Sequence, residues 1–277
     1  MTDRLEGLLS ALWPTIPDEV RSTADATWPR GRHGHVGWPY SQMMVIPSKR
    51  LVYVPIAKNG CSSVKRLMVG LSGLSHPPEM LEHVHACLDF YETGLQLKDW
   101  PTSSRQRFLC EPGWFRFAVL RDPCERLVSA YLEKFVYNRH LPGNQIHTDP
   151  VVRAVQGTAV ADHLRGISFG EFLRSLDQSS GVPPDPHWCD QHDYLPAELT
   201  DLRCYALHQL PLVAEDITVF CGHPVHLGHD NAASAPSHIE PLVEVREDLM
   251  EALPGEVAGM SLGAITPLMV ECCRRHC

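Results

Sequence analysis

The residues best suited to chemistry form one short run that separates an apolar stretch from a helix-like pattern: Lys58, Asn59, Gly60, Cys61, Ser62 and Ser63. A loop that leaves a buried strand and opens a helix presents unpaired backbone N–H groups and the positive end of the helix dipole, and both favour anions. Gly60 permits a tight turn, the serines offer hydroxyl donors, and Lys58 supplies a positive charge. We therefore expect an anion site here. The alternative is a plain strand-to-helix turn with an exposed lysine and a capping serine.

A second anion-binding pair is predicted further along the chain, where Ser129 follows Arg121 by eight residues. Between them, Asp122, Pro123 and Glu125 have the pattern of an N-cap acid, a proline in the first helical position and a capping-box glutamate. A helix is therefore predicted to begin at this point. An arginine fork at a helix start and a hydroxyl two turns along can converge on a dianion. The alternative is a capped helix with a surface arginine.

The elements that must position these residues repeat one order, in which a strand is followed by a loop and then by a helix. Apolar runs at 43–46 and 51–57 predict two strands joined by a turn, and apolar spacing over 64–71 predicts an amphipathic helix. Residues 115–120 predict another strand, followed by the capped helix. Two strand-loop-helix units predict an α/β fold with an open, P-loop-like parallel sheet flanked by helices and a site at the carboxyl ends of its strands. Further elements are expected as helices at 151–164, 169–176 and 243–253 and a strand at 210–214.

Composition narrows the class of protein. The chain has 277 residues, of which 44% are hydrophobic and 21% charged, and its net charge is −9, so it is expected to fold and not to coat nucleic acid. We expect an irregular leader over 1–40 and a single domain over 41–277. Neither a membrane span nor a secretory signal is evident, and the scattered cysteines are expected to be reduced thiols, so we expect a cytoplasmic protein.

The loop at 58–63 lacks the G-x-x-x-x-G-K-[ST] pattern of common nucleotide-binding loops, because its lysine precedes its single glycine. It resembles instead the 5′-phosphosulfate loop of sulfotransferases that use 3′-phosphoadenosine 5′-phosphosulfate (PAPS), although Ile56 and Ala57 stand between Pro55 and Lys58. The stretch 121–131, RDPCERLVSAY, is similar to the 3′-phosphate motif of that family, R-[DEN]-P-x-x-R-L-x-S-A-Y. Among such enzymes the carbohydrate sulfotransferases of the heparan 2-O and HNK-1 type are the nearest in pattern, and we expect a soluble, bacterial-type member.

The resemblance implies the sulfotransferase fold and an in-line transfer of a sulfuryl group from PAPS to a hydroxyl of a saccharide or a small-molecule acceptor, without a metal ion. Lys58 would stabilise the leaving phosphate, the rest of the loop would hold the 5′-phosphate, and Arg121 with Ser129 would hold the 3′-phosphate. A small-molecule kinase with a divergent loop and a non-catalytic nucleotide-binding module are the alternatives.

The general base is expected to be a histidine, since its pKa suits proton transfer near neutral pH. His85, with His83 as second choice, lies in a segment that resembles the base-bearing segment of heparan 2-O-type members, and alternation predicts both on one face of a strand or extended loop. His187 and Glu82 are reserve candidates. The terminal cluster Cys272–Cys277 lacks the spaced ligand pairs of a zinc site. No pattern in the sequence indicates the acceptor or the oligomeric state.

Overall fold

A computed structural model describes residues 37–74, 81–90, 92–176 and 181–227 of the chain. Most of the expected leader, the helix expected at 243–253 and the terminal cysteine cluster lie outside these ranges. The described residues divide into two compact units: residues 37–120 and 191–227 form unit 1, and residues 121–190 form unit 2. Each unit is described by itself, and the expectation of a single domain over 41–277 stays a prediction.

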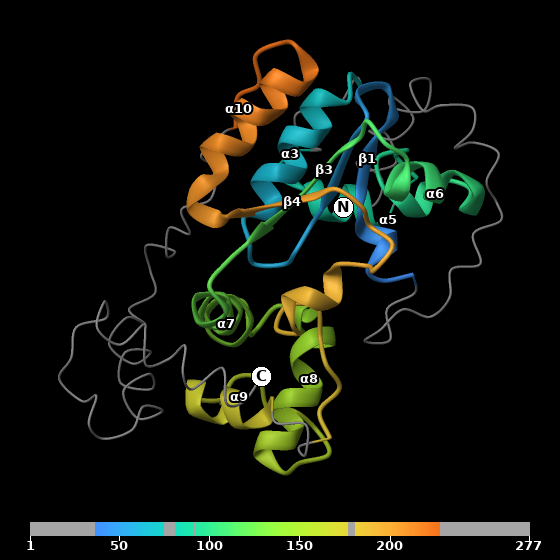
Figure 1. Ribbon diagram of the computed structural model, residues 1–277. Helices are drawn as coiled ribbons and strands as arrows, with labels where there is room; N and C mark the ends of the chain where they lie inside the picture. Colours follow the sequence, from blue (N-terminus) through green and yellow to red (C-terminus); the bar gives the residue numbers. More distant parts are fainter. Residues whose placement is uncertain (1–36, 75–80, 91, 177–180, 228–277) are drawn as a thin grey trace. The chain divides into compact units, whose positions relative to one another are not determined.

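Unit 1 is built on a four-stranded sheet with the order β1-β2-β3-β4 (Figure 1). Its strands are β1 (Met44–Ile46), β2 (Leu51–Val54), β3 (Phe115–Leu120) and β4 (Leu202–Ala206). β1 pairs antiparallel with β2, whereas β2, β3 and β4 run parallel. Because β2 and β3 are parallel neighbours, their carboxyl ends lie at the same edge of the sheet, which is where the sequence predicts the site. The predicted α/β class with a parallel sheet flanked by helices is confirmed.

Helices cover both faces of this sheet. Alternate strand residues, among them Tyr53, Phe117 and Val119, share one buried cluster with apolar residues of three helices: α3 (Cys61–Leu71), α5 (Val84–Phe90) and α10 (Leu210–Cys221). Figure 1 shows α3 and α10 side by side. From the opposite face the Arg116 Nε donates to the carbonyl oxygen of Phe108 in α6 (Thr102–Cys110) at 2.8 Å. The sheet is therefore a rigid middle layer that fixes the loops at its edge.

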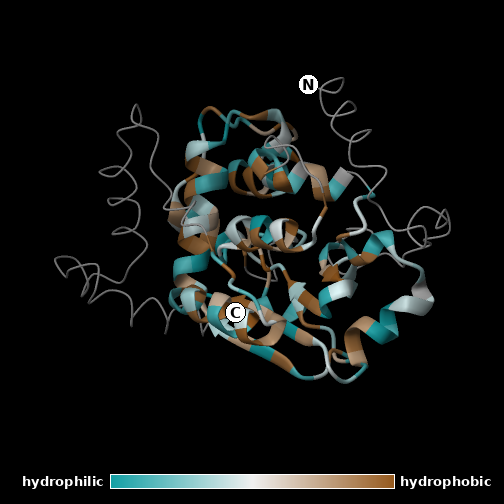
Figure 2. Cartoon of the chain, turned by 90° about the horizontal axis from the view of Figure 1, so that it is seen from above, coloured by the Kyte–Doolittle hydropathy of each residue, from teal (hydrophilic) through white to brown (hydrophobic). Residues whose placement is uncertain are grey.

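Unit 2 is helical and consists of α7 (Pro123–Tyr131), a π-helical segment η6 (Leu132–Tyr137), α8 (Pro142–Gln156) and α9 (Phe169–Ser175). As predicted, the Asp122 side chain caps α7 by accepting from the backbone N–H groups of Cys124 and Glu125, both at 3.0 Å. The core of unit 2 contains aromatic rings from these helices and from the loop before residue 190, including Phe172 and Trp188. In Figure 2 the helices carry both hydrophobic and hydrophilic residues along their length, as expected for helices that bury one face.

Three expected elements are wrong. The strand expected at 210–214 is the first part of α10, with Pro211 at the start of the helix, and the third parallel strand is β4, which the sequence did not signal because Arg203 and Cys204 are exposed. The helix expected at 151–164 ends at Gln156, where Gly157 adopts φ 66°. His83 and His85 do not lie on an extended segment, since α5 begins at Val84.

Among the described residues, no helix is both long enough and apolar enough to cross a lipid bilayer.

Candidate functional site

The loop between β2 and α3 has the backbone shape of an anion cradle. Lys58 and Gly60 both adopt left-handed conformations, each with φ 71°. For glycine this conformation has little cost, whereas a lysine in it is less stable by about 1–2 kcal/mol. Strain of this kind persists where the surrounding structure holds the residue in place, and it concentrates at functional sites. The lysine singled out from the sequence is therefore also a strained residue of the loop.

The N-terminus of α3 follows directly and has no side-chain cap. Gly60 is the N-cap, it offers no side-chain acceptor, and the first turn carries no acidic residue. Cys61 and Ser62 in this turn are half-buried, and Ser63 is buried. A helix start without an acceptor of its own is suited to bind a phosphate oxygen through its backbone N–H groups.

The side chain of Asn59 holds the loop in place. The side chain is fully buried, and its Nδ2 donates to the Val119 carbonyl oxygen at 2.8 Å and to the Gln191 Oε1 at 2.6 Å. These bonds tie the loop to the carboxyl end of β3 and to residue 191. Gln191 was not a sequence candidate for the site, because it lies 132 residues beyond Asn59 in the chain.

His85 lies beside the loop, within a hydrogen-bonded chain that the sequence did not reveal. Its Nε2 is 2.7 Å from the Ser62 Oγ, and its Nδ1 is 3.2 Å from the Nζ of the buried Lys65. Lys65 in turn lies 3.7 Å from the Asp89 carboxylate, which accepts from the Gln96 Nε2 at 3.1 Å. Because α3 carries Ser62 and Lys65 while α5 carries His85 and Asp89, only the packing of the two helices brings these groups together.

The partners of His85 assign its tautomer. A lysine ammonium only donates, so Nδ1 must accept from Lys65 and the ring proton of a neutral imidazole must sit on Nε2. His85 then donates to Ser62, whose own hydroxyl hydrogen can point elsewhere. The other two candidates from this segment, Glu82 and His83, are exposed and immediately precede α5.

Arg121 and Ser129 both belong to unit 2, at the start and on the second turn of α7. The Arg121 Nε lies 3.3 Å from the Glu125 Oε2, and the Arg121 side chain is about one quarter exposed, so its charge stays accessible. Arg126 of the same motif is buried and donates to the carbonyl oxygens of Cys189 and Pro186 at 2.6 and 2.8 Å. Arg126 therefore organises unit 2, and its guanidinium is committed to backbone groups.

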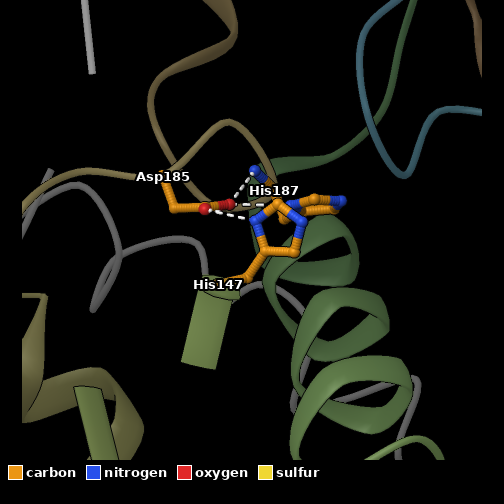
Figure 3. A group of neighbouring side chains, drawn as sticks. All are labelled: His147, Asp185 and His187. Atoms are coloured by element: carbon orange, nitrogen blue, oxygen red, sulfur yellow. Dashed lines mark hydrogen bonds and ion pairs between the residues drawn. The ribbon is translucent and has the colours of Figure 1, made fainter. Parts of the chain in front are cut away.

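The reserve candidate His187 lies in a separate cluster of unit 2 with His147 and Asp185 (Figure 3). The Asp185 carboxylate accepts from the Nδ1 of each ring at 2.7 Å. Burial raises the pKa of Asp185, but the bonds from the two histidines outweigh that effect and hold it well below its usual range. Burial lowers the pKa of His187 to about 4, against the opposing effect of Asp185, so this ring is neutral near pH 7.

Comparisons with known proteins agree with this geometry. Residues 41–206, more than half of the chain, match the family described as the sulfotransferase family. Carbohydrate sulfotransferase 8 of Homo sapiens is 30% identical over 156 residues, covering 53% of this chain and 35% of that protein. Carbohydrate sulfotransferase 10 of Rattus norvegicus is 28% identical over 156 residues, covering 54% and 40% of the two chains. Carbohydrate sulfotransferase 11 of Rattus norvegicus is 27% identical over 185 residues, covering 62% and 50%.

The chain thus spans about one third to one half of the length of these relatives. A search of solved structures gave no significant match. The matched region contains the loop at 58–63, the motif at 121–131 and the whole four-stranded sheet. With a family match over most of the described residues, and with the loop of that family at the edge of a parallel sheet, the chain belongs to the sulfotransferase family.

Proposed function

We propose that this protein transfers a sulfuryl group from PAPS to a hydroxyl group of a saccharide. The observation that carries the proposal is the strained, uncapped loop between β2 and α3 in a chain of the sulfotransferase family. The three relatives reported above are carbohydrate sulfotransferases by name, which supports a saccharide as acceptor. Neither the kinase nor the non-catalytic module expected as alternatives is supported by these matches.

The donor is PAPS, and the residues of the loop fit its 5′ end. The backbone N–H groups at the start of α3, with Ser62 and Ser63, would hold the 5′-phosphate. Lys58 would stabilise the charge that grows on the bridging oxygen as the phosphate leaves. Arg121 and Ser129, by their place in the motif of 121–131, would hold the 3′-phosphate.

In-line transfer needs little covalent work from the protein, since positioning and charge stabilisation carry most of the catalysis, as in phosphoryl transfer. The sulfur–oxygen bond to the donor phosphate breaks while a bond to the acceptor oxygen forms. The acceptor loses its proton to a base, for which His83 and His85 remain our candidates. His85 can serve only after its ring gives up the arrangement with Lys65 and Ser62, because Nε2 carries the proton there.

A cytoplasmic location is also part of the proposal. It is supported by the described cysteines, which are all free thiols. Mass spectrometry after rapid alkylation of intact cells would detect these thiols, and finding them in disulfides would contradict the location.

The deciding experiment supplies the purified protein with PAPS labelled in its sulfuryl group and a panel of neutral saccharides. We expect label in a saccharide product and tight binding of 3′-phosphoadenosine 5′-phosphate by calorimetry. A parallel titration with ATP and Mg²⁺ is the control, and we expect weak binding there. Tight binding of ATP together with no detectable binding of 3′-phosphoadenosine 5′-phosphate would contradict the proposal.

A further inference from the structure

The proposed reaction assigns no role to the cluster of His147, Asp185 and His187, yet the chemistry of these side chains is specific. His147 comes from α8, whereas Asp185 and His187 come from the loop that precedes Trp188 (Figure 3). The two imidazole rings lie edge to face with centroids 4.4 Å apart. One donor atom from each of the three residues lies within 4.8 Å of the others.

The carboxylate of this cluster is buried. Asp185 is only 7% exposed, and it accepts from the two rings and from the His187 backbone N–H at 2.8 Å. Among the described residues, its ion-pair partners are histidines alone, and no lysine or arginine lies within salt-bridge distance. A buried carboxylate is ordinarily paired with a full positive charge or bound to a metal ion.

We propose that His147, Asp185 and His187 bind a divalent transition-metal ion. Two imidazole nitrogens and a carboxylate suit Zn²⁺, Co²⁺ or Ni²⁺, and solvent water would complete the coordination. The ion takes the place of the two ring protons that now lie between Nδ1 and the carboxylate. Each ring then binds the ion through Nδ1 as a neutral imidazole with its hydrogen on Nε2, and a ring that is protonated beforehand releases one proton to solvent.

The distances require only small adjustments. Ligands of one tetrahedral zinc ion lie about 3.4 Å apart for metal–ligand bonds of about 2.1 Å. The 2.7 Å contacts of Asp185 must therefore lengthen, and the widest donor separation, at most 4.8 Å, must shorten by up to about 1.4 Å. The side chains are 17%, 10% and 20% exposed, so an ion can enter without unfolding the unit.

The ion would cross-link unit 2. It would join α8 to the loop at 185–189, the same loop whose carbonyl groups Arg126 binds from α7. Binding of the ion should therefore stabilise unit 2 against unfolding.

Co²⁺ titration of the full chain tests the proposal. Co²⁺ reports its ligands in its absorption spectrum, which matters because the chain has 10 cysteines that could bind metal through thiolates. We expect one equivalent bound with d–d bands and without a thiolate charge-transfer band. His147→Gln and His187→Gln should each weaken this binding at least about 100-fold, since each removes a ligand.

His163→Gln is the matched control, because His163 forms a separate histidine–aspartate pair with Asp149 in the described part of unit 2. It should bind Co²⁺ like the wild type. Thermal unfolding with Zn²⁺ and then with chelator gives a second readout: Zn²⁺ should raise the Tm of the wild type and of His163→Gln, but not that of His187→Gln. If the wild type shows no nitrogen–oxygen site, or if all variants bind equally, the cluster is a hydrogen-bonded one only and the proposal is wrong.

Discussion

Lys58 combines a positive charge with a left-handed backbone, and each feature has its own consequence. The positive charge stabilises the transition state, because negative charge grows on the bridging oxygen as the phosphate leaves. In the bound donor that oxygen does not yet carry this charge, so Lys58 stabilises the ground state less. The backbone conformation aims the side chain from a loop that Asn59 ties to β3. A residue that acts mainly on the transition state should affect the rate more than nucleotide binding.

Replacing this lysine tests that role. We expect Lys58→Ala to lower the transfer rate by about 10²- to 10³-fold, the usual effect of removing one group that stabilises developing charge. Binding of 3′-phosphoadenosine 5′-phosphate, measured by calorimetry, should change far less. Lys49→Ala, in the turn before β2, is the control and should keep its activity. A fully active Lys58→Ala protein would refute the leaving-group role.

From the hydrogen bonds of His85 we can predict how substitutions at this residue affect the rate. If His85 donates to Ser62, glutamine can replace it, because the amide nitrogen also donates. We expect His85→Gln to lose roughly 10-fold in rate and His85→Ala more, whereas loss of a general base costs about 10²- to 10⁴-fold. Initial rates of both variants across pH would decide the matter. Equal, large losses accompanied by loss of the acidic limb of the profile would identify His85 as the base.

The candidate residues of the loop were predictable because their types follow one another in the chain, and a strand-to-helix loop carries its own signal. The contacts of His85 with Lys65 and Ser62 were not predictable, because they join two helices whose packing no local pattern specifies. The burial of Arg126 was not predictable either, because the carbonyl oxygens of Cys189 and Pro186 that it binds lie far from it in the sequence.

At the scale of elements, the turn into α3 depends on a residue without a side chain. Gly60 has φ 71°, and a Cβ there would lie 3.0 Å from the Leu207 Cδ1. We expect Gly60→Ala to lower the free energy of unfolding by about 1–2 kcal/mol, mainly through backbone strain. Urea denaturation followed by circular dichroism would measure it.

Gly70 in the same helix is a matched control. It is exposed, and a Cβ would meet nothing within 4 Å. Gly70→Ala should therefore raise the stability by about 0.5–1 kcal/mol. Equal effects of the two substitutions would show that the left-handed turn is not under strain.

The packing of α10 on β4 should make the stability of the fold depend on pH in the alkaline range. Burial and a 2.6 Å hydrogen bond to Asp216 raise the pKa of Tyr205 to about 12. An unfolded tyrosine has a pKa of about 10, so between pH 10 and 12 the unfolded chain holds fewer protons and stability falls as pH rises. The contribution of Tyr205 is complete below pH 10.

Tyr205→Phe should remove that contribution. We expect it to be less stable than the wild type by about 1–2 kcal/mol at pH 8, and we expect the difference to shrink towards pH 12. Denaturant midpoints measured at pH 8, 10 and 11.5 would show this trend. A difference that stays constant over this range would mean that Tyr205 does not retain its proton in the folded state.

Most of the sheet was predictable, because β2 and β3 are short runs of mostly apolar residues and are followed by recognisable helix starts. β4 was missed, since a strand with exposed residues has too weak an apolar pattern. The segment at 210–214 was misassigned, because a short apolar run does not by itself distinguish a strand from a buried turn of helix.

At the scale of the whole molecule, the net charge of −9 should affect which acceptors the protein binds well. An acidic surface repels a polyanion at low ionic strength and leaves a neutral saccharide unaffected. We expect a desulfated polysaccharide to be a better acceptor than its highly sulfated form, with the gap narrowing as salt rises. KM values at low and at physiological salt would test this. A sulfated acceptor that is preferred most strongly at low salt would indicate a local basic surface that outweighs the net charge.

The division into two units could not be predicted, since the boundary between residues 120 and 121 falls inside an unbroken strand-to-helix pattern. That division also sets an order of events during synthesis. β4 pairs with β3, yet it leaves the ribosome about 80 residues later, after residues 121–190 of unit 2. At a translation rate of about 5–20 residues per second, the edge of β3 that pairs with β4 stays unpaired for roughly 4–16 s. During that time the nascent chain exposes an unpaired, apolar strand edge, so slow translation or a chaperone that covers this edge should decide how much of the protein folds.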